Sequence, residues 1–286
     1  MRRSRAVRVV RATTIVALLA WSLGPILLGV LTSISTQAEV QSGQWLPTST
    51  NVSGYRALLS NGGATTTSGF VPSEIGAFGH AMFNSVAITL ETTAVLLVLA
   101  VTAGYAFSRL RFPGRRVMFG SLVATLIVPA LAVIVPLWRV MANLHLIGTQ
   151  IGLLLIYVSA NAPLAVWLMY IHARELPISV EEAALSDGCT RFQTFRLVVL
   201  PQLWGGIAAV AAIMALSVWG EFFIPLLFAP TAATKPVTVL ITEFVGKYTT
   251  NQPLLAAAGI LMLLPPALLA IILSRQIRGL LSGWSG

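Results

Sequence analysis

Residue types that support enzyme chemistry are sparse in this chain, and none of them forms a familiar catalytic pattern. Cys189 is the only cysteine, so the chain cannot form an internal disulfide. His80, His145 and His172 lie far apart and share no spacing typical of a metal site. A glycine-rich phosphate loop, a nucleophile elbow and a zinc-binding helix motif are absent from the sequence. We therefore expect no catalytic residue, no metal site, no bound cofactor and no ATP hydrolysis by this chain.

The most patterned polar segment is residues 175–201, which lies between two long apolar runs. Ser179 and Glu182 have the spacing of a capping box, so we expect a helix to begin there. Asp187 and Gly188 are expected to end that helix, because glycine tolerates the left-handed conformation of a C-terminal cap. The first half of the segment therefore predicts one short helix.

The second half of the same segment predicts another short helix. Thr190 and Gln193 repeat the capping-box spacing. Phe192, Phe195 and Val199 recur at helical spacing, which predicts that they lie on one face of the helix. Two short helices in a polar connection leave two interpretations open: a docking element for another protein, or an amphipathic connector on the membrane surface.

The order of residues in this segment resembles the signature loop of bacterial ABC importer permeases. That signature is Glu-Ala-Ala, three residues, Gly, nine residues, a branched aliphatic residue, one residue and Leu-Pro, and every position is filled here. The resemblance implies that residues 175–201, called the coupling loop below, dock into a cytosolic ATPase and transmit its motion. It assigns coupling to eight residues: Glu181, Glu182, Ala183, Ala184, Asp187, Gly188, Leu200 and Pro201. Both glutamates would offer charge to basic groups of the ATPase, and the alanines would allow close approach.

The composition is that of an integral membrane protein. Hydrophobic residues make up 56% of the chain, charged residues only 9%, and the mean hydropathy is +0.85. A soluble domain of 286 residues could not bury so much apolar surface. The net charge of +9 comes from short basic clusters beside apolar runs, which is typical of membrane topology rather than of nucleic-acid binding.

The apolar runs predict an all-α protein with six transmembrane helices in one permease domain, residues 1–286. The predicted spans are residues 12–34, 82–108, 117–138, 151–171, 203–228 and 254–273. Residues 37–79 are expected to form an outside loop, and Pro129 and Pro136 are expected to kink or break the third span. The first run exceeds the roughly 7–15 residues of a signal-peptide core, which favours a retained span.

The basic residues orient this layout. Six spans with both termini in the cytoplasm place 14 of the 18 basic residues inside, as the positive-inside rule requires. Those 14 are Arg2, Arg3, Arg5, Arg8, Arg11, Arg109, Arg111, Arg115, Arg116, Arg174, Arg191, Arg196, Arg275 and Arg278. The sequence therefore predicts a multi-pass protein of the bacterial plasma (inner) membrane, in contact with lipid and not with nucleic acid.

A second segment, residues 104–114, is similar to a landmark of carbohydrate-type permeases, Ala-Tyr-Ala-Phe-x-Arg-x-x-Phe-Pro-Gly. Gly104 replaces the first alanine of that pattern. The resemblance implies a maltose-type importer subunit that works with a homologous second permease, an ATPase dimer and an external solute-binding protein. ATP and magnesium would bind the partner ATPase, and a sugar or related small solute would cross by alternating access.

A few polar side chains fall within or near the predicted spans, where they usually face a bundle interior or a water path. Glu91, Arg139, Asn161, Trp219 and Glu221 are the candidates for a translocation path. Glu91 is expected to pair with Arg139, because the second and third spans are antiparallel. Glu221 is equally compatible with a structural hydrogen-bond role. Trp219 and Asn161 are also compatible with ordinary packing between helices.

Three other functions remain to be separated from a sugar importer. A cargo of glycerol phosphate, amino sugar or polyol keeps the same transporter class. An ion-coupled secondary transporter would use carboxylates near the middle of the membrane, such as Glu91 and Glu221. A membrane anchor without transport activity would tolerate charge changes in the coupling loop.

Overall fold

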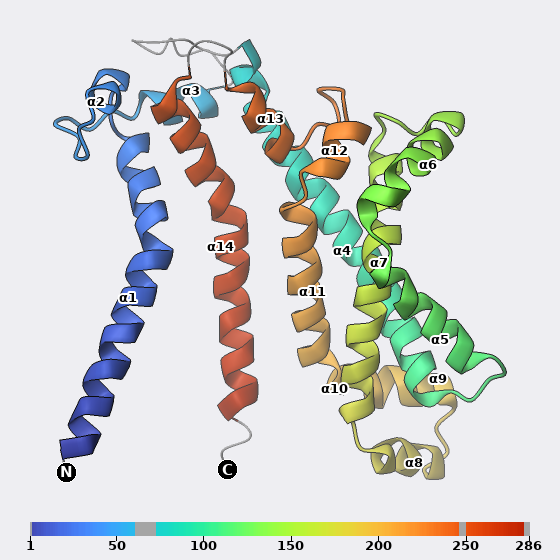
Figure 1. Ribbon diagram of the computed structural model, residues 1–286. Helices are drawn as coiled ribbons and strands as arrows, with labels where there is room; N and C mark the ends of the chain where they lie inside the picture. The colour runs from blue at the N-terminus through green and yellow to red at the C-terminus, as the bar shows by residue number, and fades with distance from the viewer. Residues whose placement is uncertain (1, 61–72, 246–249, 283–286) are drawn as a thin grey trace. The chain divides into compact units, whose positions relative to one another are not determined.

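The computed structural model describes residues 2–60, 73–245 and 250–282 (Figure 1). Within those ranges the regular elements are helices, apart from one isolated bridge between Val245 and Thr250, which confirms the all-α prediction. Residues 61–72 of the predicted outside loop lie outside the described residues.

The helices follow one another along the described parts of the chain. In order they are α1 (Arg2–Ser33), α2 (Gln37–Gln41), α3 (Ser53–Leu59), η1 (Ser73–Ala77), α4 (Phe78–Arg109), α5 (Arg115–Ala124), η2 (Thr125–Ile127), α6 (Ala130–Asn143), α7 (Gln150–Glu175), α8 (Ile178–Ser186), α9 (Arg191–Gln193), η3 (Thr194–Val199), α10 (Leu200–Gln202), α11 (Trp204–Trp219), α12 (Phe223–Phe228), α13 (Val237–Glu243) and α14 (Gln252–Ser282).

The lengths and composition of these helices support four to six membrane spans. Four helical stretches among the described residues are long and apolar enough to cross a bilayer alone: Val7–Ser33, Ile75–Arg109, Gln150–Glu175 and Gln252–Ile272. Two bent helix pairs raise the count to six if each pair is one span. The first pair joins the stretch from α5 to η2 with α6, and the second joins the stretch from α9 to α10 with α11. The predicted six-span layout is compatible with this range.

Two of the predicted spans are broken rather than continuous. The third is interrupted at Val128 and Pro129, and Pro129 occupies the N-cap of α6, as the prolines predicted. The fifth, predicted over residues 203–228, contains two helices, because α11 ends at Trp219 and α12 begins at Phe223. The reason for the second break lies in hydrogen bonding around Glu221, described below.

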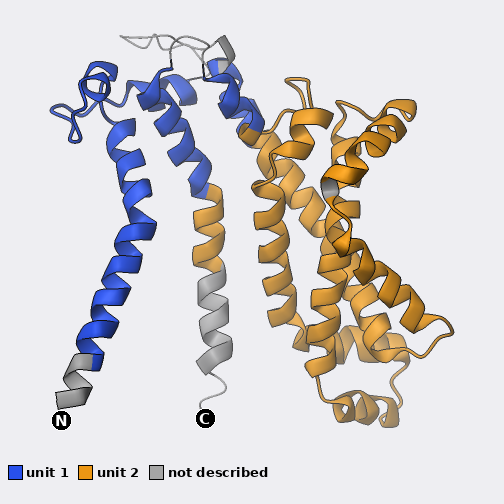
Figure 2. Cartoon of the chain, viewed as in Figure 1, with its two compact units in different colours: residues 1–82, 239–264 blue, residues 83–238, 265–286 orange. Residues whose placement is uncertain are grey.

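The chain forms two compact units (Figure 2). Unit 1 comprises residues 1–82 and 239–264, and unit 2 comprises residues 83–238 and 265–286. Within unit 1, α3 packs on the start of α14. A Cβ added to the buried Gly54 would lie 3.5 Å from Cβ of Ala257. The side chain of Gln37 also donates to the carbonyl of Thr250 over 3.1 Å and accepts from the N–H of Gln252 over 3.0 Å.

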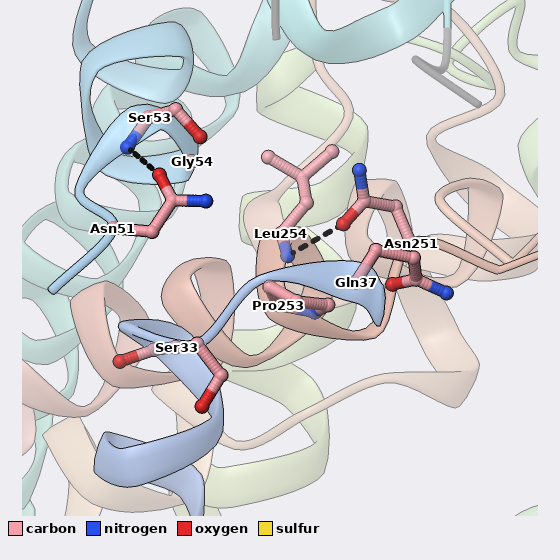
Figure 3. A pocket seen from close by; sticks show the side chains of 9 residues that line it. Ser33, Gln37, Asn51, Ser53, Gly54, Asn251, Pro253 and Leu254 are labelled. Atoms are coloured by element: carbon pink, nitrogen blue, oxygen red, sulfur yellow. Dashed lines mark hydrogen bonds between the residues drawn. The ribbon is translucent and has the colours of Figure 1, made fainter. Parts of the chain in front are cut away.

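Unit 1 contains a small polar pocket between these segments (Figure 3). Asn51 and Asn251 each use a side-chain oxygen to accept a backbone N–H, from Ser53 over 3.0 Å and from Leu254 over 3.1 Å. The pocket has a volume of about 10 Å³, which is the space of roughly one water molecule. This pocket therefore has no room for a transported solute.

The core of unit 2 is formed by α4, α7 and α11. Glycines let these helices approach closely, as small residues do in membrane bundles. A Cβ added to Gly104 of α4 would lie 2.9 Å from both Cβ of Met169 and the backbone nitrogen of Tyr170 on α7. A Cβ added to Gly206 of α11 would lie 2.8 Å from Cγ of His172. Gly104 is therefore required by the contact between α4 and α7.

Candidate functional site

The first helix of the coupling loop, α8, begins two residues earlier than its capping-box spacing predicted. Pro177 occupies the N-cap in an extended conformation, and no side chain caps the helix. Ser179 therefore lies inside the first turn instead of before it, and the capping box expected with Glu182 is wrong. The residue at which α8 begins determines which of its side chains face outward.

The end of α8 follows the prediction. The helix ends at Ser186, Asp187 is the C-cap, and Gly188 has a φ of +89°. The N–H of Cys189 then donates to the carbonyl of Ala184 over 3.0 Å, which closes the last turn. A left-handed glycine thus turns the chain from α8 toward α9.

The second helix of the coupling loop begins with the predicted capping box. The N–H of Thr190 donates to Oε1 of Gln193 over 2.8 Å, and the N–H of Gln193 donates to the Thr190 hydroxyl over 3.3 Å. A π-helical turn, η3, follows and packs against α8. Val199 is buried and Phe195 half-buried, but Phe192 is 68% exposed. Only Phe195 and Val199 of these three residues are therefore packed within the chain, because Phe192 precedes the turn that makes the contact.

One side of α8 is anchored to the end of α4. Nε of Arg109 lies 2.8 Å from Oε1 of Glu181, with side chains only 10% and 13% exposed. The hydroxyl of Tyr105 donates to Oε2 of Glu181 over 3.2 Å, and the Arg109 guanidinium also donates to the carbonyl of Leu176. The Tyr105 ring further contacts Phe195 with centroids 4.7 Å apart. These contacts tie both halves of the coupling loop to α4.

The anchor corrects the role expected for one of the two glutamates. Glu181 was expected to offer its charge to a partner, but its carboxylate is neutralised within the chain by Arg109. Glu182 is exposed and keeps that role as a prediction. The same division holds for the alanines, since Ala183 is exposed and Ala184 is buried.

The outward face of α8 is therefore well defined. Its exposed residues include Glu182, Ala183 and Asp187, together with the apolar side chains of Ile178 and Leu185. Gly188 is exposed beside them. At the far end of the loop, Leu200 is half-buried and Pro201 is exposed. The loop thus combines a fixed inner side with a free, mixed polar and apolar outer side.

The predicted ion pair between Glu91 and Arg139 is not formed. Both oxygens of the exposed Glu91 carboxylate instead accept from Nε2 of Gln150, over 2.8 and 2.9 Å. The amide lies at the first residue of α7, which places a neutral donor where the guanidinium was expected. Arg139 is exposed on α6.

Two other path candidates make structural hydrogen bonds. Asn161 on α7 donates to the carbonyl of Tyr157 over 2.9 Å and accepts from the hydroxyl of Ser217 on α11 over 3.0 Å. Oε1 of Glu221 accepts from the N–H groups of Phe223 and Ile224, over 3.0 and 3.2 Å. Glu221 therefore caps the first turn of α12, as its alternative structural role predicted.

The break between α11 and α12 follows from the same residue. Pro225 has no N–H, so the carbonyl of Glu221 cannot receive its usual helical hydrogen bond. That carbonyl accepts instead from the hydroxyl of Thr238, over 3.0 Å. The backbone ladder is thus interrupted at Glu221, and its free groups are satisfied by Thr238 and by the carboxylate cap.

The polar residues that sequence reasoning missed are three threonines on α4. The hydroxyls of Thr89, Thr92 and Thr93 are buried and have no hydrogen-bond partner among the described residues, and the same is true of Nε1 of Trp219. Their grouping within an apolar span was the available signal. Thr89 and Trp219 line a cavity of about 90 Å³ with Pro265, which is smaller than the roughly 300 Å³ of typical small-molecule sites.

The comparisons with known proteins place this architecture in a family. Residues 96–280 match the family described as "Binding-protein-dependent transport system inner membrane component". The chain belongs to this family. The permease shares 29% identity over 266 residues with the trehalose transport system permease protein SugB of Mycobacterium tuberculosis, covering 92% of each chain. It shares 35% identity over 205 residues with a putative ABC transporter permease protein, ORF1, of Streptomyces antibioticus, covering 71% of this chain and 90% of the relative.

Other relatives and a solved structure agree with this assignment. The permease is 27% identical over 269 residues to the sulfoquinovosyl glycerol transport system permease protein SmoH of Agrobacterium fabrum, covering 93% of this chain and 90% of that one. Its fold matches that of a bacterial ABC transporter involved in the import of the acidic polysaccharide alginate, with a TM-score of 0.80, 21% identity and coverage of 96% and 98%. The predicted resemblance to importer permeases is thereby confirmed.

Proposed function

We propose that the permease is the transmembrane subunit of an ATP-driven, binding-protein-dependent importer for a sugar or a related small organic solute. The observation that best supports this is the two-sided geometry of α8. Glu181 is held to Arg109 at the end of α4, while Glu182 and Ala183 face outward. A helix that is fixed on one side and free on the other is suited to carry a partner's motion into a membrane span.

The proposed mechanism is alternating access. Closure of the ATPases would move α8, and the contacts of Glu181 with Arg109 and Tyr105 would pass that displacement to α4. The spans would then rock about a central solute site and expose it to each side in turn. ATP would drive the change by binding with higher affinity to one of the two states of the assembly than to the other.

The proposed partners are a homologous second permease, a cytosolic ABC ATPase dimer that binds ATP and Mg²⁺, and an extracytoplasmic solute-binding protein. The cavity beside Trp219 is too small for a sugar, so we expect the second permease to complete the solute site. The proposed orientation in the inner membrane places both termini and the coupling loop in the cytoplasm, because that arrangement satisfies the positive-inside rule.

The proposed cargo rests on the relatives rather than on a binding site in this chain. Their names specify trehalose, sulfoquinovosyl glycerol and diacetylchitobiose as transported compounds. A glycosidic compound of one or two rings is therefore the first class to test, and glycerol phosphate, amino sugars and polyols are the next.

Uptake of labelled solutes by the assembled transporter in proteoliposomes would test the proposal. We expect uptake to require MgATP on the side of the membrane that corresponds to the cytoplasm. Glu182→Lys should abolish uptake without reducing the amount of permease in the membrane. Ala183→Cys, made in a Cys189→Ala background, should cross-link to the ATPase. Uptake driven by an ion gradient without ATP would indicate a secondary transporter instead, and absence of the cross-link would overturn the coupling role.

A further inference from the structure

A basic cavity of about 440 Å³ lies in unit 2, lined by residues from the ends of α4 and α7 and the starts of α5 and α8. Its walls include four arginines, Arg109, Arg115, Arg116 and Arg174, and the ring of Tyr170. The volume falls within the range of about 300–1,000 Å³ that small-molecule sites occupy. None of the functions proposed above uses this cavity.

Three of the four guanidinium groups lack a compensating carboxylate. Arg109 is neutralised by Glu181, but in the described part of the chain no carboxylate oxygen lies within 4.0 Å of Arg115, Arg116 or Arg174. Arg115 donates to the carbonyl of Leu110 over 2.9 Å, and this neutral acceptor leaves its charge in place. The cavity therefore carries three positive charges that favour a bound anion.

The Arg174 side chain is held in place by an aromatic neighbour. Its guanidinium carbon lies 5.7 Å from the centre of the Tyr170 ring, and Nη1 donates to the Tyr170 hydroxyl over 3.3 Å. Tyr170 in turn contacts Phe119 of α5, with ring centroids 4.3 Å apart. One wall of the cavity is thus a preorganised aromatic and cationic surface that joins α5 to α7.

The apolar surface beside the cavity indicates what kind of anion fits. Arg115 and Arg116 are followed at once by Val117 and Met118, which are 75% and 55% exposed. A guanidinium pair at the end of an exposed apolar helix is typical of the boundary between lipid headgroups and acyl chains. The ligand that matches both surfaces carries a phosphate and an apolar tail.

We propose that this cavity binds the phosphate group of an anionic phospholipid, whose acyl chains lie against Val117 and Met118 of α5. Planar guanidinium groups of Arg116 and Arg174 would hydrogen-bond the phosphate oxygens. The bound phosphate would lie next to Arg109 and so beside the anchor of the coupling loop. The lipid would hold this end of the permease at the membrane surface.

Binding of phosphatidylglycerol to the purified full-length chain in neutral detergent would test this proposal by native mass spectrometry. We expect one tightly bound phosphatidylglycerol, and weaker binding of phosphatidylcholine. Each exposed arginine removed should lower the affinity about 5-fold, so Arg116→Gln/Arg174→Gln should lower it roughly 25-fold. Arg11→Gln/Arg56→Gln removes the same charge from exposed sites elsewhere and should leave the affinity nearly unchanged.

Thermal unfolding without lipid would check that each variant is folded, and Arg116→Gln alone offers a milder change of an exposed side chain. An equal loss of affinity for phosphatidylglycerol in the Arg11/Arg56 control would mean that the lipid is attracted by the overall charge of the chain, which would overturn the proposal. Inorganic phosphate that displaces phosphatidylglycerol at similar concentration would identify the ligand as a free anion. Loss of the lipid on assembly with the ATPase, with Arg116 cross-linking to an acidic residue of that partner, would assign the cavity to protein docking instead.

Discussion

Arg109 and Glu181 form an ion pair with 2.8 Å between Nε and Oε1, and this pair joins the last residue of α4 to the first turn of α8. Both side chains are almost buried, so solvent screens their attraction only weakly. Removing one member would leave the other with an unpaired charge in a shielded place. In the proposed mechanism, this pair is the contact that would transmit motion between the coupling loop and α4.

Replacing Glu181 by Gln should lower stability and uptake together. The lost charge-assisted contacts to Arg109 and Tyr105 should reduce the free energy of unfolding by about 1–3 kcal/mol. Glu182→Gln is the matched control, because that neighbouring carboxylate is exposed. Thermal unfolding and ATP-driven uptake would be measured for both. Equal unfolding temperatures for the two variants would argue against a structural anchor at Glu181.

Replacing Gly188 by Val should impair coupling through the backbone alone. The glycine has a φ of +89°, and no atom lies within 4 Å of a Cβ added there. A branched residue in this conformation should cost about 1–2 kcal/mol, whereas Asn tolerates it better. We expect uptake to fall more for Gly188→Val than for Gly188→Asn, at equal amounts of permease in the membrane. Identical uptake by the two variants would mean that the left-handed turn is not needed.

Replacing Gly104 by Ala should destabilise unit 2, although alanine is usual at this position in carbohydrate-type permeases. The new methyl group would lie 2.9 Å from Met169 Cβ and from the Tyr170 nitrogen, and overpacking of this kind typically costs about 1–3 kcal/mol. Gly120→Ala is the control, since open space surrounds that helical position and alanine favours helix by about 1 kcal/mol. Thermal unfolding in detergent should move in opposite directions for the two variants; a shared direction would contradict the close packing of α4 on α7.

Thr36 and Glu39 form a capping box at the start of α2, and acid should weaken it. The backbone N–H of Thr36, with further hydrogen bonds from Thr48 and the Thr36 hydroxyl, lowers the pKa of Glu39 from 4.5 to about 2. Because the folded-state pKa is depressed, the stabilisation is present above pH 4.5 and is lost as the pH falls from about 4.5 to 2.

Unfolding temperatures of the permease and of Glu39→Gln would measure this effect across pH. The difference between them should be constant above pH 5 or so and shrink toward pH 2. Glu182→Gln, which removes an exposed carboxylate, should show no such convergence. A difference that stays constant down to pH 2 would refute the pKa shift.

Local signals predicted the parts of the coupling loop that depend on neighbours in the sequence. Thr190 and Gln193 formed their capping box, and Gly188 ended α8, because a cap needs only residues within one helical turn. The Ser179 box failed although its spacing was correct, since Pro177 took the N-cap first. Spacing thus identifies the residues able to cap a helix, but the backbone decides where the helix begins.

The path candidates show the limit of the same reasoning. Sequence alone suggested a partner for Glu91 from the antiparallel order of two spans, and it chose Arg139 instead of Gln150. It could not choose between a structural and a path role for Glu221, nor detect the hydrogen bond from Ser217 to Asn161. The contacts of Glu91 and Asn161 depend on the rotation of one helix against another, which hydropathy does not encode. The Glu221 cap is local, but it forms only because the chain breaks between α11 and α12.

The amino-acid sequence by itself determined that this is a helical membrane protein with a polar, helical connection at residues 175–201 between its apolar runs, because hydropathy, caps and charge clusters act over a few neighbouring residues. Only the tertiary structure decided that Glu181 turns inward to Arg109 while Glu182 faces outward. It also decided that Gly104 must be small and that four arginines share one cavity. Those outcomes depend on which distant segments meet, and that is set by packing of whole helices rather than by local preference.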